Sequence, residues 1–232
     1  MSKNRQKQMS ESFILGIILS VVGGYFDAYT YIARDGVFAN AQTGNVVLFG
    51  ISLASGDVLR ALRYVPPIIA FLLGVFLAEY FRRHNGMAKL HWRQHVILIE
   101  LGIILLVTFL PSGKIDGVNF DLISNVLISF ACSLQVQSFR RIRGITCATT
   151  MCTGNMRSAA ENMTRYVTER DPKLLHSAGK YLGIIGFFVV GAVISTVITR
   201  LIGTYAVAFT AAGLLAVFFM MFAKPVNAED DD

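Results

Sequence analysis

The chain has 232 residues, of which 54% are hydrophobic and 16% are charged, and its net charge is +6. Soluble domains average about 45–50% apolar and about 25% charged residues, so this composition indicates an integral membrane protein and leaves no room for a soluble catalytic domain. Its lysines and arginines cluster in short loops, where they set membrane topology, so we expect no nucleic-acid partner.

Apolar segments follow one another along the whole chain, and most have spanning length. The first continues to Ala33, which is too long for a signal-peptide core, so we predict an uncleaved span. Residues 1–12 are then a cytoplasmic N-terminus and residues 224–232 an acidic, solvated tail. The expected segments are Phe13–Ala33, Val37–Ala54, Tyr64–Phe81, His95–Leu110, Leu122–Phe139, Ile145–Met163, Tyr181–Thr199 and Tyr205–Phe222.

A duplicated motif divides these segments into two membrane repeats, residues 13–111 and 112–223. The tripeptide Thr43-Gly44-Asn45 recurs 110 residues later as Thr153-Gly154-Asn155. In each copy the chain before the motif is typical of extended backbone and the chain after it is typical of a helix. Paired polar interruptions at equivalent positions are typical of discontinuous helices that build a solute site.

Loop charges discriminate between two topologies. If both broken elements re-enter the membrane, 16 of the 21 Lys and Arg residues lie on the cytoplasmic side, against about 12 if both elements cross. The count favours an all-α protein with six transmembrane helices and two re-entrant half-helices, built as two inverted repeats with both termini cytoplasmic. Eight spans, four plus four, remain the alternative.

The two half-helices predict a binding site at their N-terminal ends. A helix that begins inside the protein points unpaired N–H groups and a partial positive charge inward, which favours an anion. Thr43 and Thr153 are the natural N-caps, Gly44 and Gly154 allow close approach, and Asn45 and Asn155 offer donors and acceptors. Arg157, one turn further along, would add positive charge. Helix capping without a ligand is the structural alternative.

Two acidic residues fall within apolar segments, where a carboxylate is costly and indicates a function. Asp27 lies past the middle of the first segment, and Glu100 lies within the fourth. Either could carry a proton or couple an ion. The alternatives are an interfacial position for Asp27 among neighbouring tyrosines and a pairing role for Glu100.

Other chemistry is absent from the sequence. The four histidines lack metal-ligand spacing, and there is no phosphate-binding glycine loop or nucleophile elbow. The three cysteines have no disulfide framework. We therefore expect no enzyme activity, no metal and no cofactor.

Two stretches resemble a known family. Gly24-Tyr25-Phe26-Asp27-Ala28-Tyr29 followed by Gly36 to Asn45 is similar to the hallmark of the YoaK-like family, small multi-pass membrane proteins grouped under a domain of unknown function. Gln135, Gln137 and Met151-Cys152-Thr153-Gly154 resemble its second half. The resemblance implies a membrane location and about six spans, and it implies no substrate.

These observations together predict a plasma-membrane transport protein. The first hypothesis is a secondary carrier for a small anionic or carboxylate solute. Its partners would be the lipid bilayer, the solute and, in a homo-oligomer, further copies of the chain. A passive channel of the same architecture and a non-transporting scaffold are the alternatives.

Overall fold

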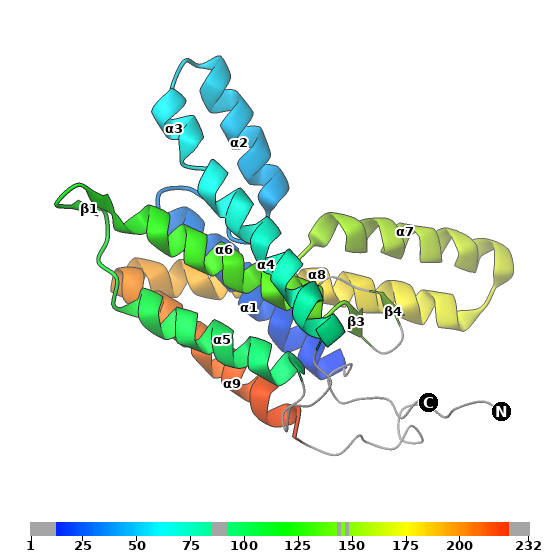
Figure 1. Cartoon of the computed structure of the whole chain (residues 1–232). Helices are drawn as coiled ribbons and strands as arrows, with labels where there is room; N and C mark the ends of the chain where they lie inside the picture. The colour runs from blue at the N-terminus through cyan, green and yellow to red at the C-terminus, as the bar shows by residue number, and fades with distance from the viewer. Residues whose placement is uncertain (1–12, 85–91, 143–144, 147–148, 223–232) are drawn as a thin grey trace.

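The computed structural model describes residues 13–84, 92–142, 145–146 and 149–222. The predicted cytoplasmic N-terminus and the predicted acidic tail lie outside these residues. The described chain is helical apart from two short β-hairpins (Figure 1). The helices are α1 (Phe13–Ala33), α2 (Gln42–Ala54), α3 (Val58–Leu62), α4 (Val65–His84), α5 (Trp92–Thr108), α6 (Phe120–Ser138), α7 (Cys152–Glu169), α8 (Pro172–Ile202), the 3₁₀ helix η2 (Gly203–Phe209) and α9 (Thr210–Met220).

Each hairpin joins two helices. Strand β1 (Lys114–Ile115) pairs antiparallel with β2 (Val118–Asn119), and Asp116 and Gly117 between them both have positive φ angles, of 50° and 82°. Two consecutive residues in this region form the tight turn whose twist matches paired strands. The second hairpin pairs β3 (Arg141–Ile142) with β4 (Ile145–Thr146).

Helix α1 matches its predicted bounds, whereas α8 begins nine residues before the predicted Tyr181. Asp171 explains this difference, because its side chain accepts a hydrogen bond from Lys173 N at 2.9 Å and Pro172 occupies the first helical turn. A capping carboxylate followed by proline starts a helix even where the sequence is polar. The apolar criterion therefore missed the first two turns of α8.

Four stretches of the described residues are long and apolar enough to cross a membrane: Phe13–Ala33, Val58–His84, Phe120–Ser138 and Pro172–Met220. The last contains α8, η2 and α9, so it turns back on itself (Figure 1). Helix α5 is apolar but has 17 residues. The all-α class and the membrane-like character are thus confirmed, while six spans and inverted repeats stay a prediction.

The two halves pack through equivalent helix pairs. Helix α1 of the first half packs most extensively along α8 of the second, and α6 packs along α4. Both pairs are joined by close glycine contacts: Gly191 lies against the Val21 carbonyl, and Gly74 lies against the Phe130 carbonyl. Small residues at such contacts let helix backbones approach closely, which is the usual way that membrane helices associate.

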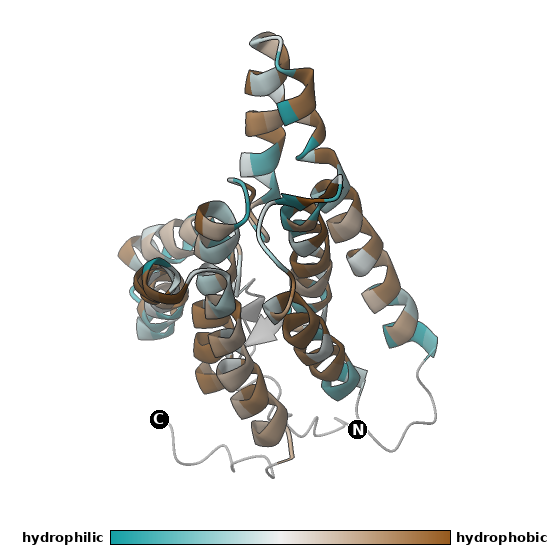
Figure 2. Ribbon diagram, turned by 90° about the vertical axis from the view of Figure 1, so that its left-hand side faces the viewer, coloured by the Kyte–Doolittle hydropathy of each residue, from teal (hydrophilic) through white to brown (hydrophobic). Residues whose placement is uncertain are grey.

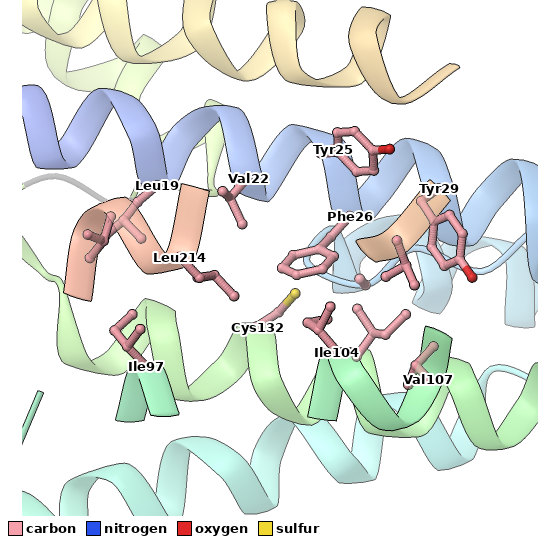
Figure 3. Close-up of a cluster of buried hydrophobic side chains, with 14 of the residues drawn as sticks. Leu19, Val22, Tyr25, Phe26, Tyr29, Ile97, Ile104, Val107, Cys132 and Leu214 are labelled. Atoms are coloured by element: carbon pink, nitrogen blue, oxygen red, sulfur yellow. The ribbon is translucent and has the colours of Figure 1, made fainter. Parts of the chain in front are cut away.

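The main apolar core lies between α1, α5, α6 and α9. Figure 3 shows Phe26 of α1 beside Cys132 of α6, with Ile104 of α5 and Leu214 of α9 close by. All four side chains are inaccessible to solvent or nearly so. Many large apolar side chains of the helices are exposed, and much of the ribbon is coloured hydrophobic (Figure 2), as expected for helices that face lipid.

Arg34 is completely buried just after the end of α1. Its guanidinium donates to Asp121 Oδ1 at 3.0 Å and to the Pro111 carbonyl at 2.7 Å, and its own carbonyl accepts from Asn125 Nδ2 at 2.6 Å. Tyr29 Oη accepts from Arg34 Nε at 3.0 Å. Arg34 therefore holds α1 against the α5–α6 connection.

We expect Arg34→Met to lower the free energy of unfolding by about 3–5 kcal/mol, because it leaves Asp121 and several carbonyls without their charged partner. The measurement is thermal unfolding of the purified protein in detergent. Arg63→Met is the matched control, since Arg63 pairs with Asp35 at 2.7 Å in an exposed ion pair worth at most about 1 kcal/mol. Equal melting temperatures for the two variants would contradict the assignment.

Gly191→Ala should destabilise the protein by about 1–3 kcal/mol, because the added methyl group would collide with the Val21 backbone. Gly186→Ala, on the same helix, meets no atom within 4 Å and serves as the control. The same unfolding measurement checks both variants, and a Gly191→Ala protein as stable as Gly186→Ala would refute the close contact.

Candidate functional site

The first chain break is capped by a carboxylate from another helix. Helix α2 begins at Gln42, and its N-cap, Ala41, makes no side-chain cap. Instead, Asp27 Oδ1 on α1 accepts hydrogen bonds from the backbone N–H groups of Asn40, at 2.6 Å, and Ala41, at 3.3 Å. Asp27 therefore fixes the buried loop residue Asn40 and the N-cap residue Ala41 directly before the first turn of α2, at the positive end of that helix.

Thr43 is not the N-cap that the sequence predicts, because it lies inside the first turn of α2 and its side chain is exposed. Gly44 allows a close approach, as predicted, since a Cβ atom there would lie 2.8 Å from the Phe38 ring. The Phe38 ring in turn stacks on Tyr31 with ring centroids 4.8 Å apart. Close packing thus accounts for this glycine.

The Asn45 side chain stabilises the loop that precedes α2 by hydrogen bonds. Its Oδ1 accepts from Phe38 N at 2.9 Å, and its Nδ2 donates to Phe38 O at 2.7 Å and to Gln42 Oε1 at 2.8 Å. The side chain is completely buried. Because these bonds use both the donor and the acceptor side of the amide, Asn45 holds the loop rather than offering a free group to a solute.

The second break repeats the geometry of the first. Met151 is the N-cap and α7 begins at Cys152, each 110 residues after its counterpart in the first half. Asn155 is buried like Asn45, and Thr153 is exposed like Thr43. Thr153 is therefore not an N-cap either. Gly154 is also exposed, and a Cβ atom there would meet nothing within 4 Å.

The structure does not place Arg157 beside the first chain break, so it adds no positive charge there. Its side chain is 80% exposed and pairs with Glu161 one turn along α7, at 2.7 Å. The Glu161 carboxylate raises the pKa of the Arg157 guanidinium above its ordinary value. Exposed pairs of this kind contribute little to stability, so the contact describes a solvated helix face.

Both breaks meet α1 at Gly23. On one side, Asn40 Nδ2 donates to the Gly23 carbonyl at 3.1 Å. On the other, Thr150 packs so closely that a Cβ atom on Gly23 would lie 2.5 Å from its Cγ2. The residue has to be glycine here, because Thr150 of the second break occupies the space that a side chain would fill.

Helix α6 completes the site from the opposite side. Gln135 Nε2 donates to the Leu19 carbonyl, one turn before Gly23, at 3.3 Å. Cys132, one turn before Gln135, lies close to the Asn40 side chain and within electrostatic reach of Asp27 and Glu100. Figure 3 shows its sulfur pointing towards α1. We call Asp27, Asn40, Cys132, Gln135 and Thr150 the polar cluster.

Several oxygen atoms of the polar cluster lack a partner within the part of the chain that the structure describes. These are Asn40 Oδ1, Gln135 Oε1 and Thr150 Oγ1, on side chains that are at most 3% exposed. Unpaired buried oxygens are rare and costly in folded proteins. The three side chains all contact the stretch of α1 from Leu19 to Gly23, which makes this stretch the candidate binding site.

Glu100 is the second carboxyl group in this region. It is completely buried on α5, and both of its oxygens lack a hydrogen-bond donor among the described residues. A carboxylate without any partner in such a place is strongly disfavoured. The described residues contain no group of three or more His, Cys, Asp and Glu side chains that could hold a metal ion.

The sequence prediction named Asp27 and Glu100 correctly as buried carboxyl groups but missed Asn40, Cys132, Gln135 and Thr150 as their neighbours. Gln135 carried a signal, because it interrupts an apolar segment at the position equivalent to Tyr25. Asn40 carried none, since a loop asparagine beside a glycine motif is ordinary turn chemistry.

Asn45→Ala should lower the free energy of unfolding by about 2–4 kcal/mol without any ligand, because it leaves Phe38 N, Phe38 O and Gln42 Oε1 unpaired. Thermal unfolding in detergent measures the effect. Thr43→Ala is the matched control, since that exposed side chain makes no bond that would be lost. An unchanged melting temperature for Asn45→Ala would show that the amide serves a ligand rather than the loop.

Comparison with known proteins adds a family and no activity. The family described as "Protein of unknown function (DUF1275)" matches residues 15–221, which includes both breaks and the whole polar cluster. No curated protein and no solved structure matches the chain. The sequence thus resembles other chains of uncharacterised activity along nearly its full length, and the protein belongs to the DUF1275 family.

Proposed function

We propose that the protein is a secondary carrier that binds a small solute at the polar cluster. The observation that carries this proposal is the chain break before α2, where the N–H groups of Asn40 and Ala41 bond Asp27 of a neighbouring apolar helix. Irregular backbone within a membrane-like bundle is tolerated only where it is enclosed by protein or lines a solute path. Discontinuous helices at the interface between repeats are the usual carrier solution.

The packing supports two inverted repeats. Helix α1 of the first half packs against α8 and α9 of the second half. Its equivalent in the second half, α6, packs against α4 and α5, which are the equivalents of α8 and α9 in the first half. The two half-helices begin 110 residues apart and leave the bundle in different directions (Figure 1). Six spans, formed by α1, α4, α5, α6, α8 and α9, with α2 and α7 as half-helices, agree with this exchange.

The start of α2 does not favour the anionic or carboxylate solute that the sequence predicts. The N–H groups of Asn40 and Ala41, which directly precede α2, already bond the Asp27 carboxylate, and a second anion there would be repelled. The binding residues of the proposal are therefore the members of the polar cluster. Asn45 holds the first loop beside them, and Asp27 or Glu100 couples solute movement to an ion.

We expect the protein, reconstituted into proteoliposomes, to accumulate a solute against its gradient when an ion gradient is imposed. A panel of radiolabelled amines, amino acids and carboxylates, each tested with proton and sodium gradients, would identify the solute. Asp27→Asn should abolish the accumulation, because it removes the charge that both caps α2 and lies in the polar cluster.

Asp57→Asn is the matched control for this experiment. Asp57 also caps a helix, since its Oδ1 accepts from Arg60 N at 2.9 Å, but it lies on the exposed α2–α3 connection. If a solute equilibrates across the membrane without accumulating, the protein is a passive channel and not a carrier. If a well-folded sample transports no solute at all, the non-transporting scaffold is the hypothesis that remains.

A further inference from the structure

We infer that the polar cluster binds a small monovalent cation through oxygen atoms, an inference that rests on the proposed binding function of the same site. The shared chemistry is a single positive charge surrounded by hydrogen-bond acceptors. An alkali ion and the head of a small ammonium compound both have it.

The hydrogen bonds of the polar cluster use the amide N–H donors of its side chains and leave the oxygen acceptors without partners among the described residues. The amide NH₂ groups of Asn40 and Gln135 donate to the Gly23 and Leu19 carbonyls, at 3.1 and 3.3 Å. These bonds fix the orientation of both amides and leave Oδ1 and Oε1 unpartnered. An anion or a carboxylate would need donors at these positions, whereas a cation needs the oxygens that are present.

The two carbonyl acceptors are one helical turn apart on the same face of α1, so the two amide groups lie side by side. Thr150 adds its hydroxyl oxygen from the second break, against Gly23. The free oxygens thus come from the first break, the second break and α6. A ligand held between them would join the two halves of the protein.

Charge favours the same ligand. Asp27 supplies a carboxylate at the cluster, and Glu100 is a second carboxyl group within electrostatic reach of Cys132. The nearest arginine along α1, Arg34, is two turns away and is bonded to Asp121. Arg157 faces solvent beside Glu161. A buried carboxylate with no cationic side chain beside it among the described residues is best balanced by a bound cation.

One carboxylate, two amide oxygens and one hydroxyl oxygen suit a monovalent ion better than a divalent one. Calcium and magnesium sites usually gather several carboxylates or retain water. The probes that match this donor set are an alkali ion, ammonium and methylammonium, each with a single positive charge.

The test is a thermal-shift titration of the purified full chain with NaCl, KCl, NH₄Cl and methylammonium chloride, at constant ionic strength set by N-methyl-D-glucamine chloride. Binding to the folded state raises the melting temperature by mass action. We expect a saturable rise with at least one of these cations. Which salts act distinguishes an alkali ion from an ammonium compound.

Gln135→Leu removes one acceptor at nearly constant size, and Thr150→Val removes another with its shape kept. Each should raise the half-saturating concentration about tenfold or more, because a hydrogen bond or ligand to a charge is lost. Gln135→Glu should keep the response. Ser52→Ala, whose buried hydroxyl bonds only the Leu48 carbonyl of its own helix, is the control and should titrate as the unmodified protein does.

The inference is wrong if no cation raises the melting temperature of the folded protein. It is also wrong if Gln135→Leu and Thr150→Val both titrate like Ser52→Ala. A rise in melting temperature with N-methyl-D-glucamine acetate but with none of these chlorides would indicate an anion site instead. The carrier proposal fails separately. If the protein binds a cation but transports nothing in proteoliposomes, the cation site is supported and the carrier proposal is wrong. If it accumulates a solute but binds no cation, the carrier proposal is supported and the cation site is wrong.

Discussion

The structure depends on the bonds between the Asp27 carboxylate and the loop that precedes α2. A buried backbone N–H group that lacks a partner costs free energy on the order of 1–3 kcal/mol. Asp27 bonds two groups at this break, those of Asn40 and Ala41. Together with the bond from Asn40 Nδ2 to the Gly23 carbonyl, they fix the loop against α1 and place Asn40 beside Cys132. Without this carboxylate the loop would keep only its Gly23 bond to α1, and the polar cluster would lose its negative member.

A second set of buried polar contacts fixes the other end of α1. Arg34 bonds Asp121 and the carbonyls that end α5, while Tyr25 and Tyr29 donate their hydroxyls to the carbonyls of Ala206 and Thr204 in η2. One helix therefore carries contacts to α5, α6 and η2 at one end and to both chain breaks near its middle. The glycine contacts with α8 lie in the same stretch. This concentration explains why α1 has the largest share of buried residues among the four membrane-length stretches.

The sequence predicted local features well and spatial neighbours poorly. The bounds of α1, the helical half of each broken element and the 110-residue offset all followed from apolar runs and a repeated tripeptide. The burial of Arg34 could not be predicted, because its partners are carbonyls that lie more than 70 residues away in the chain. Thr43 and Thr153 were wrongly predicted as caps because each helix begins one residue before its threonine, a shift that the tripeptide pattern cannot resolve. The roles of Gln135 and Asn40 depend on the α1 carbonyls that they bond, which are distant from Gln135 in the sequence and belong to another element in the case of Asn40.

The glycine contacts between α1 and α8 have a mechanical consequence. At Gly24 and Gly191 the two backbones touch without side chains between them, so there are no interlocked ridges to resist rotation about the contact point. A change of crossing angle about this point keeps the contact intact. Gly74 differs, because the Ser133 side chain of α6 lies closer to it than the Phe130 carbonyl does. The backbone contact between α1 and α8 therefore lies directly beside Gly23, where both loops meet α1, so a change of angle between these helices would reach the polar cluster first.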